Sequence, residues 1–410
     1  MPTQKTDRNT TWTITADDET WTLAKKATIA AGPTNGIDEN GHSGSAIRVL
    51  GDIRVGGMAA GVYVNGSNSS VFIGEDSTIR ARQSADGIFS AAAGADIVNH
   101  GAIHGAFAGI RGAIWSDVRN YGSISGDYGI LHEGAGSQIY NYGRVSAGDT
   151  GIVTDANGSY LLNARGAVIR GDDIAVQIRD TGDMELRNRG TIRSDNFAIE
   201  DENGALSVRN TGRIIGDVAL GGGDDILDTR GGTVGGIVYG GGGDDTLITS
   251  RSNIKLQESA MGGAEDRVVS SASYKLGAHV EDLILIGGKD IHGTGNGGDN
   301  RISGNAGDNV LKGKGGADMI TGGAGNDLLH GGADTDVFFF AKGDDVDRVR
   351  DFKDGEDLIG ISGVESYADF TALNIKQTTD GVAIDLGDGD KLIIEGLLKS
   401  DFTYDDIYLA

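Results

Sequence analysis

Residues that could bind a metal ion recur at every ninth position between Gly295 and Phe339. This stretch divides into five units in one register: GNGGDNRIS, GNAGDNVLK, GKGGADMIT, GGAGNDLLH and GGADTDVFF. Position 6 is always Asp or Asn and position 8 is always apolar, and the position-6 residues are Asn300, Asn309, Asp318, Asp327 and Asp336. Side-chain oxygens in such number are hard ligands, which suit Ca²⁺ far better than Zn²⁺. The spacing therefore predicts a calcium-binding array.

Glycine in the same units predicts the turns that would position these ligands. Each unit opens with Gly, and the first four units carry another Gly at position 4. Glycine permits positive φ and close backbone approach, so each unit should be a tight turn followed by a short strand. A flexible glycine-rich linker would not keep position 8 apolar. Stacked turns would align carboxylates that repel one another without a cation, so we expect metal binding and folding to be coupled.

The five units resemble the nonapeptide G-G-x-G-x-D-x-U-x of the repeats-in-toxin (RTX) family. In that family two nonapeptides form one turn of a parallel β-roll, and Ca²⁺ lies between loops two repeats apart. The resemblance implies that Asp318 and Asp336 share an ion at one edge, while Asn309 and Asp327 share another at the opposite edge. Asn300 and Asn309 occupy positions where the family prefers Asp, so their sites should be weaker. The implied glycine ligands are Gly307, Gly316 and Gly325 at position 4, and Gly313, Gly322 and Gly331 at position 1.

Two similar units occur upstream of this array. LGGGDDILD (220–228) and GGGGDDTLI (240–248) place Asp225 and Asp245 at the ligand position, each two residues before a leucine. We interpret them as further turns that carry one or two calcium sites.

A looser repeat fills the region before these units. Its landmark is an Asn before each turn, at Asn99, Asn120, Asn141, Asn163, Asn188 and Asn210, with spacings of 21, 21, 22, 25 and 22 residues. Apolar and polar residues alternate within each repeat with the period of a strand, and Asn and Gly occupy the corners. The pattern favours coils of a parallel β-helix, about eight in number, with the Asn side chains in a hydrogen-bonded ladder; a β-sandwich array is the alternative. The repeats resemble those of autotransporter passengers.

These patterns predict an all-β fold, a right-handed parallel β-helix solenoid continuing into a calcium-binding parallel β-roll. The predicted divisions are an N-terminal cap (1–45), β-helix repeats that end in calcium-type loops (46–250), connector strands (251–294), the RTX β-roll (295–345) and an acidic, β-rich C-terminal export region (346–410).

The segment 336–363 resembles the closing segment of serralysin-type rolls. Its acidic positions are matched by Asp347, Asp351 and Asp357. Two alternative roles remain for these aspartates, calcium binding and the capping of a strand end. The acidic tail resembles the secretion region of type I exporter substrates, which implies the type I secretion apparatus as a partner. The N-terminal stretch has no apolar core of a signal peptide, so we expect a secreted, extracellular or cell-surface protein exported by that route.

Composition excludes several functions. The net charge of −25 opposes nucleic-acid binding, and the absence of cysteine removes thiol nucleophiles and disulfides. The sequence contains no run of about 18 apolar residues, so it predicts no membrane-spanning helix. The chain has no His-Glu-x-x-His, no Gly-x-Ser-x-Gly and no phosphate-binding loop.

The sequence therefore predicts a secreted calcium-binding structural or interaction protein, of the surface-layer, adhesin or matrix type, which folds on binding several Ca²⁺ ions outside the cell. Its partners would be the cell surface, extracellular polysaccharide or further copies of itself. The alternative is a polysaccharide lyase or epimerase built on the β-helix, which needs carboxylates and bases aligned on one face. The candidate acids and bases on the coils are Asp117, Arg119, Asp127, Glu133 and Arg144. They are scattered among different repeat positions, so we expect no catalytic residue.

Overall fold

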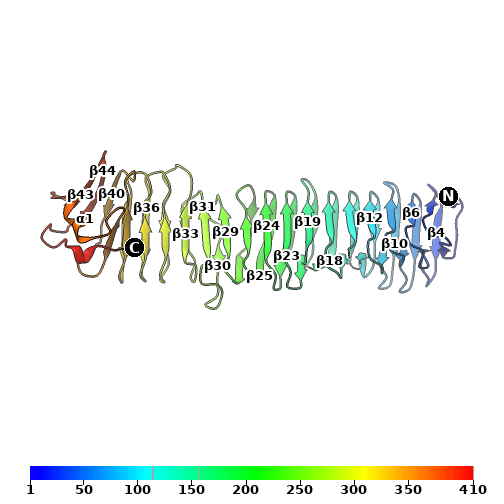
Figure 1. The fold of residues 1–410 in the computed structure, drawn as a ribbon. Coiled ribbons are helices and arrows are strands. Elements are labelled where there is room, and N and C mark those ends of the chain that lie inside the picture. The colour runs from blue at the N-terminus through cyan, green and yellow to red at the C-terminus, as the bar shows by residue number, and fades with distance from the viewer. Residues whose placement is uncertain (113–114, 156, 410) are drawn as a thin grey trace. The chain divides into compact units, whose positions relative to one another are not determined.

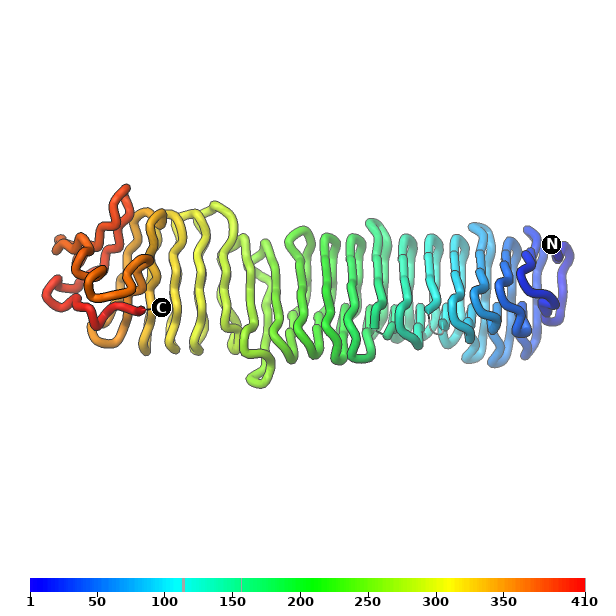
Figure 2. Tube along the Cα trace, in the orientation of Figure 1, coloured from blue at the N-terminus to red at the C-terminus, as the bar shows by residue number. Residues whose placement is uncertain are grey.

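The structure is a computed structural model that describes residues 1–112, 115–155 and 157–409. Over these residues the chain forms about 16 turns of an all-β parallel solenoid, which confirms the predicted fold class. Two compact units are present, Met1–Tyr239 and Gly240–Ala410. Figure 1 labels the strands, and Figure 2 shows how the backbone of each unit winds through successive coils.

One sheet of the first unit receives a strand from each turn, and the strands pair in parallel with matching register, for example Asn99 with Asn120. Its strands are β1 (Thr3–Gln4), β3 (Thr20–Leu23), β6 (Ala46–Val49), β9 (Ser70–Ile73), β12 (Asp96–Asn99), β15 (Asp117–Asn120), β17 (Gln138–Asn141), β19 (Ser159–Asn163), β22 (Met184–Asn188), β24 (Leu206–Asn210) and β26 (Ile226–Asp228).

The second sheet of this unit is also parallel and contains the longer strands. Its strands are β2 (Trp12–Thr13), β4 (Thr28–Ala31), β5 (Ile37–Asp38), β7 (Asp52–Val55), β8 (Val62–Val64), β10 (Thr78–Ala81), β11 (Ile88–Ser90), β13 (Ala102–His104), β14 (Ala108–Gly112), β16 (Ser123–His132), β18 (Arg144–Asp155), β20 (Val168–Arg170), β21 (Ile174–Arg179), β23 (Thr191–Asp201), β25 (Arg213–Gly222) and β27 (Thr233–Val234).

The core of the first unit is a narrow column of aliphatic side chains. Ile97, Val118 and Ile139 lie at paired positions of β12, β15 and β17 and are almost fully buried. Burial of each such side chain contributes about 1.5–3 kcal/mol. The strict inward–outward alternation in the sequence therefore fixes which face of each strand enters the core.

The predicted asparagine ladder is confirmed. Nδ2 of Asn120 donates to Oδ1 of Asn141 at 2.9 Å, and Nδ2 of Asn141 donates to Oδ1 of Asn163 at the same distance. The series runs from Asn99 to Asn210, which donates to the hydroxyl of Thr229. Each amide is fully buried and also bonds main-chain groups, so from Asn99 to Asn210 the ladder satisfies one corner of each coil with neutral side chains.

Residues 1–45 pair in the same way as the turns that follow them. Thr20 pairs with Ala46 in parallel register, and Trp12 and Trp21 pack edge to face with ring centroids 5.6 Å apart. The predicted cap thus has solenoid geometry, and the predicted domain boundaries stay predictions.

The second unit repeats every 18 residues through the five nonapeptides. One sheet contains β29 (Thr246–Thr249), β31 (Arg267–Ser270), β33 (Asp282–Leu285), β35 (Arg301–Ser303), β37 (Met319–Thr321), β39 (Val337–Phe340) and β41 (Leu358–Ile361). The opposite sheet contains β32 (Tyr274–Lys275), β34 (Gly293–Thr294), β36 (Val310–Lys314), β38 (Leu328–Gly332) and β40 (Val346–Val349). Strand β28 (Val238–Gly242) spans the boundary between the two units, and the short strand β30 (Leu256–Gln257) lies near the start of the second.

Alternate nonapeptides enter opposite sheets of this unit. The position-8 residues Ile302, Ile320 and Phe338 stack on one side and Leu311 and Leu329 on the other, all fully buried. Two nonapeptides therefore make one turn, as the resemblance implied.

The strands of the C-terminal part are not all parallel, unlike those of the solenoid turns. Strands β42 (Asn374–Gln377), β43 (Gly381–Gly387) and β44 (Asp390–Glu395) pair antiparallel, and β44 joins β40 in parallel. A short helix, α1 (Tyr367–Ala372), precedes them. Near the end of this region, which the sequence predicts to be β-rich, a capping box between Thr403 and Asp406 starts a 3₁₀ turn over Tyr404–Asp406. Residue 410 lies outside the described residues.

Substitution Asn141→Ala should lower the stability of the first unit by about 3 kcal/mol, because it removes one acceptor of the buried amide of Asn120, the acceptor of the N–H of Gly143 and the side-chain donor to Oδ1 of Asn163. The midpoint of urea unfolding, followed by circular dichroism, measures the change. The exposed Asn203 is the matched control, and its replacement by Ala should shift the midpoint little. Equal shifts for the two variants would show that the ladder does not stabilise the coil.

Candidate metal centre

Position-6 side chains of alternate nonapeptides form a column at one edge of the roll. The backbone N–H of Asn300 donates to Oδ1 of Asp318 at 2.8 Å, and that of Asp318 donates to Oδ1 of Asp336 at 3.0 Å. The backbone N–H of Asp336 continues the series to Oδ1 of Asp357, also at 3.0 Å. Each residue directly precedes a strand of the first sheet, so strand stacking sets the spacing of the carboxylates.

The remaining nonapeptides form a second column at the opposite edge. The backbone N–H of Asn309 donates to Oδ1 of Asp327 at 2.7 Å, and that of Asp327 donates to Oδ1 of Asp347 at 2.9 Å. Asn309 and Asp327 directly precede β36 and β38, and Asp347 lies within β40. The structure thus brings together the residues that the sequence grouped in pairs, and it adds Asp347 and Asp357 as the next members of their columns.

The second oxygen of each aspartate is what makes these columns a candidate metal centre. Oδ2 of Asp318, Asp327, Asp336 and Asp347 has no hydrogen-bond partner among the described residues, although the four side chains are at most 2% exposed. Buried polar atoms in folded proteins nearly always have a partner. A hard cation bound by these oxygens would supply one.

Glycine at position 1 keeps the space beside these oxygens open. A Cβ at Gly313 would overlap Oδ2 of Asp318 and lie 2.7 Å from the carbonyl oxygen of Gly331. A Cβ at Gly322 or Gly331 would likewise overlap Oδ2 of its own unit's aspartate. Carboxylate and main-chain carbonyl oxygens therefore face the same small volume, and this donor set fits Ca²⁺.

Glycine at position 4 has a different structural task. Gly316 and Gly325 have φ values of +91° and +118°, and a Cβ at either would press against the backbone of the preceding turn, at Gly298 or Gly307. These residues let successive turns stack closely. Gly307 itself lies against the backbone of Lys289. Their predicted role as ligands stays a prediction.

The two asparagines of the columns are engaged differently from the aspartates. Nδ2 of Asn300 donates to the carbonyl of Val280 at 2.9 Å, and Nδ2 of Asn309 donates to the carbonyl of Ile291 at 2.7 Å. Their amides thus find protein partners on both atoms. An amide nitrogen cannot bind a cation, and the weaker asparagine sites stay a prediction.

Burial raises the pKa of every column aspartate that has an unpartnered oxygen. The pKa of Asp318 and of Asp327 rises to about 7, that of Asp347 to about 8 and that of Asp336 to about 6. Neighbouring carboxylates contribute further, for example Asp336 to the shift at Asp318. Without a cation, the folded roll therefore holds these groups partly protonated near neutral pH.

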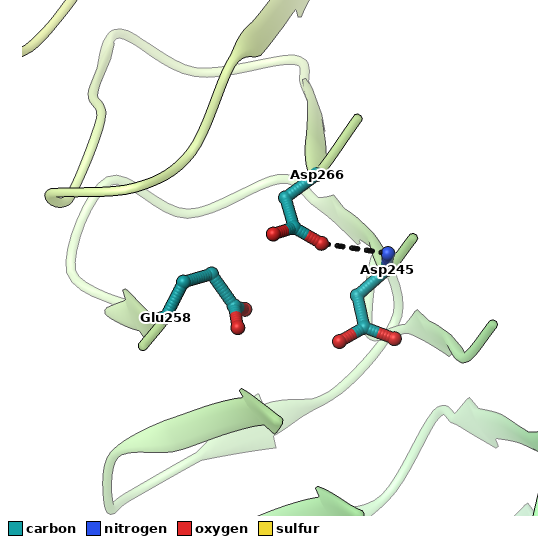
Figure 3. A group of neighbouring side chains, drawn as sticks. All are labelled: Asp245, Glu258 and Asp266. Carbon is teal, nitrogen blue, oxygen red and sulfur yellow. Dashed lines mark hydrogen bonds between the residues drawn. The ribbon is translucent and has the colours of Figure 1, made fainter. Parts of the chain in front are cut away.

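The other predicted site residues lie at three separate places. Oδ1 of the half-buried Asp351 accepts the N–H of Gly331 at 3.0 Å, beside the first column. Asp225 is buried in the first unit and accepts the N–H of Leu206, but its unit has Leu220 where the others have the glycine that opens the cradle. Asp225 is therefore the least suitable of the aspartates. Asp245 lies in the second unit beside two acids that the sequence did not single out, Glu258 and Asp266 (Figure 3).

Sequence reasoning missed Glu258 and Asp266 because they belong to the segment 251–294, which has no nonapeptide. The available signal was the Asp that immediately precedes the apolar strand at Arg267–Ser270, as in the nonapeptides. Glu258 had no such signal.

The metal-free second unit should lose stability as the pH rises. Because the pKa values of Asp318, Asp327 and Asp347 are raised from 3.8 to about 7 or 8, folding takes up protons across this window, and the stabilising contribution of protonation disappears as the pH passes through the raised values. In chelator, the melting temperature should fall between about pH 5 and about pH 8, and saturating Ca²⁺ should abolish the fall.

Differential scanning calorimetry at a series of pH values measures this effect. Replacing the same three aspartates with Asn should flatten the profile recorded in chelator. A melting temperature that does not change with pH in chelator would contradict the burial of ionisable oxygens in the columns.

Comparison with known proteins agrees with this geometry. The family model described as the RTX calcium-binding nonapeptide repeat (4 copies) matches residues 237–253, 294–329 and 313–347. These ranges contain Asp245 and the column residues from Asn300 to Asp347.

No curated protein matches the chain. Among solved structures, the chain matches the solution structure of the AlgE6R3 subunit from the Azotobacter vinelandii mannuronan C5-epimerase at 28% sequence identity and a TM-score of 0.23, over 30% of this chain and 78% of that chain. The family match, together with the two aspartate columns, identifies RTX calcium-binding nonapeptide repeats within a β-solenoid.

Proposed function

We propose that this protein is a secreted, non-enzymatic calcium-binding protein of the structural or interaction type, whose second unit becomes rigid when Ca²⁺ fills the aspartate columns. One observation carries the proposal: buried aspartate oxygens without protein partners face glycine-lined spaces at two edges of the roll. Nothing in an ordinary folding core requires such oxygens. Several adjacent sites of this kind make cation binding a condition of stable folding.

The difference in calcium concentration between the inside and the outside of the cell determines where the second unit folds. Inside the cell free calcium is scarce, so the columns stay empty and the roll is unstable. Extracellular calcium modules have dissociation constants on the order of 10⁻⁴–10⁻³ M. Ions that bind only the folded state stabilise it by mass action, so arrival outside the cell would drive folding.

Export by the type I apparatus follows from the same proposal. RTX repeats are typical of secreted proteins, and the closing segment has the serralysin-like acidic positions described above. An unfolded, calcium-free tail is the form that a narrow export channel can accept. The helices of the described residues are too short and too polar to cross a membrane.

The first unit supplies the surface for interaction. A solenoid presents long rows of equivalent side chains, which suits extended partners. On the outside of the coils, Tyr121 stacks on Tyr142 with centroids 4.8 Å apart, and His100 stacks on Tyr121 at 4.6 Å. Tyr121 and Tyr142 remain more than 40% exposed. This aromatic row supports a cell-surface or polysaccharide partner, in the manner of an adhesin or matrix protein.

The positions of the acid–base candidates favour the non-enzymatic proposal over a polysaccharide lyase or epimerase. Asp117 and Arg119 lie on β15 in one sheet and form an ion pair with each other. Asp127 lies on β16 in the other sheet, and Arg144 begins β18. Groups in different sheets do not converge on one substrate atom.

Replacing Asp318, Asp327 and Asp336 with Asn together should raise the calcium concentration at the midpoint of folding by about tenfold or more, because each change removes a charged ligand. Circular dichroism during calcium titration of the full chain measures the midpoint. The matched control changes the exposed Asp354, Asp401 and Asp405 to Asn, with the same change in net charge. Identical midpoints for the two triple variants would refute the column ligands.

Incubation with alginate, pectin and related acidic glycans should yield neither new reducing ends nor unsaturated products, whereas pull-down with the same glycans or self-association in calcium should be detectable. Product formation that the substitution Arg119→Ala abolishes would instead establish the enzymatic alternative.

A further inference from the structure

Three buried acids of the second unit gather outside the two aspartate columns. Asp245 precedes β29, Glu258 follows β30 and Asp266 precedes β31. One carboxylate oxygen from each lies within 4.8 Å of the others. Figure 3 shows the three carboxylates directed toward a common space, and the most exposed side chain, that of Glu258, is only 7% exposed.

Glu258 and Asp266, the two acids from the segment 251–294, each accept a main-chain hydrogen bond with one carboxylate oxygen and not with the other. Oε2 of Glu258 accepts the N–H of Gly241 at 3.1 Å, and Oδ1 of Asp266 accepts the N–H of Asp245 at 2.8 Å. Oε1 of Glu258 and Oδ2 of Asp266 are buried and have no hydrogen-bond partner among the described residues. The main chain therefore orients both carboxylates while leaving one oxygen of each available to a ligand.

A glycine makes room for these oxygens. A Cβ at Gly240 would overlap both Oε1 of Glu258 and Oδ2 of Asp245. Gly240 opens its nonapeptide as Gly313 and Gly331 open theirs, so the same backbone device borders this space. Two acids from different turns thus direct oxygens at one small volume, which any side chain at position 240 would fill.

The chemistry of the cluster requires a positive partner. Three ionised carboxylates in a buried space repel one another, and a bound cation removes this repulsion. All donors are oxygens, with no histidine or cysteine among them, which selects a hard cation over zinc. Calcium–oxygen distances of about 2.3–2.6 Å allow two ligands of one ion to lie up to about 5 Å apart, which accommodates the observed grouping.

A related hydrogen-bond pattern occurs a second time in this unit. The N–H of Asp336 donates to Asp357 and the N–H of Gly331 donates to Asp351, while the N–H of Asp245 donates to Asp266 and that of Gly241 to Glu258. In both places two carboxylates from the following turn accept N–H groups of one nonapeptide, but among the described residues three acids gather closely only at Asp245, Glu258 and Asp266. Glu258 reaches this position from a segment without nonapeptide pattern.

We propose that Asp245, Glu258 and Asp266 bind one calcium ion at a three-carboxylate site whose third ligand lies outside the nonapeptide repeats. The site goes beyond the proposed function, because it does not depend on secretion or on a surface partner. Affinity of calcium sites rises with the number of charged ligands, so this site should fill at lower calcium concentration than a column site with two carboxylates. Its ion would also fasten the segment around Glu258 to the glycine loop at Gly240.

Calcium binding to the full chain tests the proposal through Glu258→Gln, which removes the charge and keeps the shape. Isothermal titration with Ca²⁺, and metal analysis after equilibrium dialysis, should show that the tightest site is lost or weakened by about tenfold or more. The matched control is Glu265→Gln, which alters an exposed side chain in the same turn and should bind as the wild type does. Equal ion numbers and affinities for the two variants would overturn the proposal.

Melting temperatures distinguish a metal ligand from a structural residue. In chelator, Glu258→Gln should raise the melting temperature or leave it unchanged, because it relieves a buried cluster of acids; in calcium it should lower the melting temperature. A similar fall under both conditions would overturn the proposal.

The column variant Asp318→Asn, Asp327→Asn and Asp336→Asn should lose other ions and retain this one. The two sets of variants therefore separate failure of this site from failure of the proposed function.

Discussion

The one-sided hydrogen bonding of buried aspartates is the constraint on which the second unit depends. Parallel stacking at 18-residue intervals places each carboxylate beneath the backbone N–H of an equivalent residue, and that bond occupies only one oxygen. A carboxylate has no proton to donate to the next carboxylate in the column. The second oxygen must therefore meet a proton or a cation, and the folded state of this unit is linked to both.

The first unit shows the alternative solution to the same geometric problem. From Asn99 onward its coils also bury one polar side chain at an equivalent corner, but these side chains are asparagines, whose amide donates to the next carbonyl and whose carbonyl accepts from the previous amide. The ladder is complete without an ion. Asn300 and Asn309 use their amides in a comparable way within the roll, which shows that the residue at the corner, rather than the solenoid backbone, decides whether a metal is needed.

This division gives the chain two kinds of stability. The neutral ladder bonds without an ion, whereas the buried acids of the second unit leave oxygens for a cation. Under the proposed function, the stacked aromatic row of the first unit would serve recognition and the ion sites of the second unit would serve regulation. A change in calcium would then alter the folding of the second unit and leave the interaction surface of the first intact.

The sequence alone determined the features that arise from local periodicity. The nine-residue register identified the column aspartates and the inward leucines and isoleucines, and the spacing of the asparagines identified the ladder, because a solenoid brings residues of equal phase together. Only the tertiary structure revealed Glu258, since its approach to Gly240 depends on the path of a segment without repeats. It also decided the 3₁₀ turn at Tyr404, where Thr403 and Asp406 form a capping box. In a repetitive sequence, residues at equivalent repeat positions stack in space, so the sequence predicts their contacts. Where the repeats stop, the contacts depend on how the segment packs, which only the tertiary structure shows.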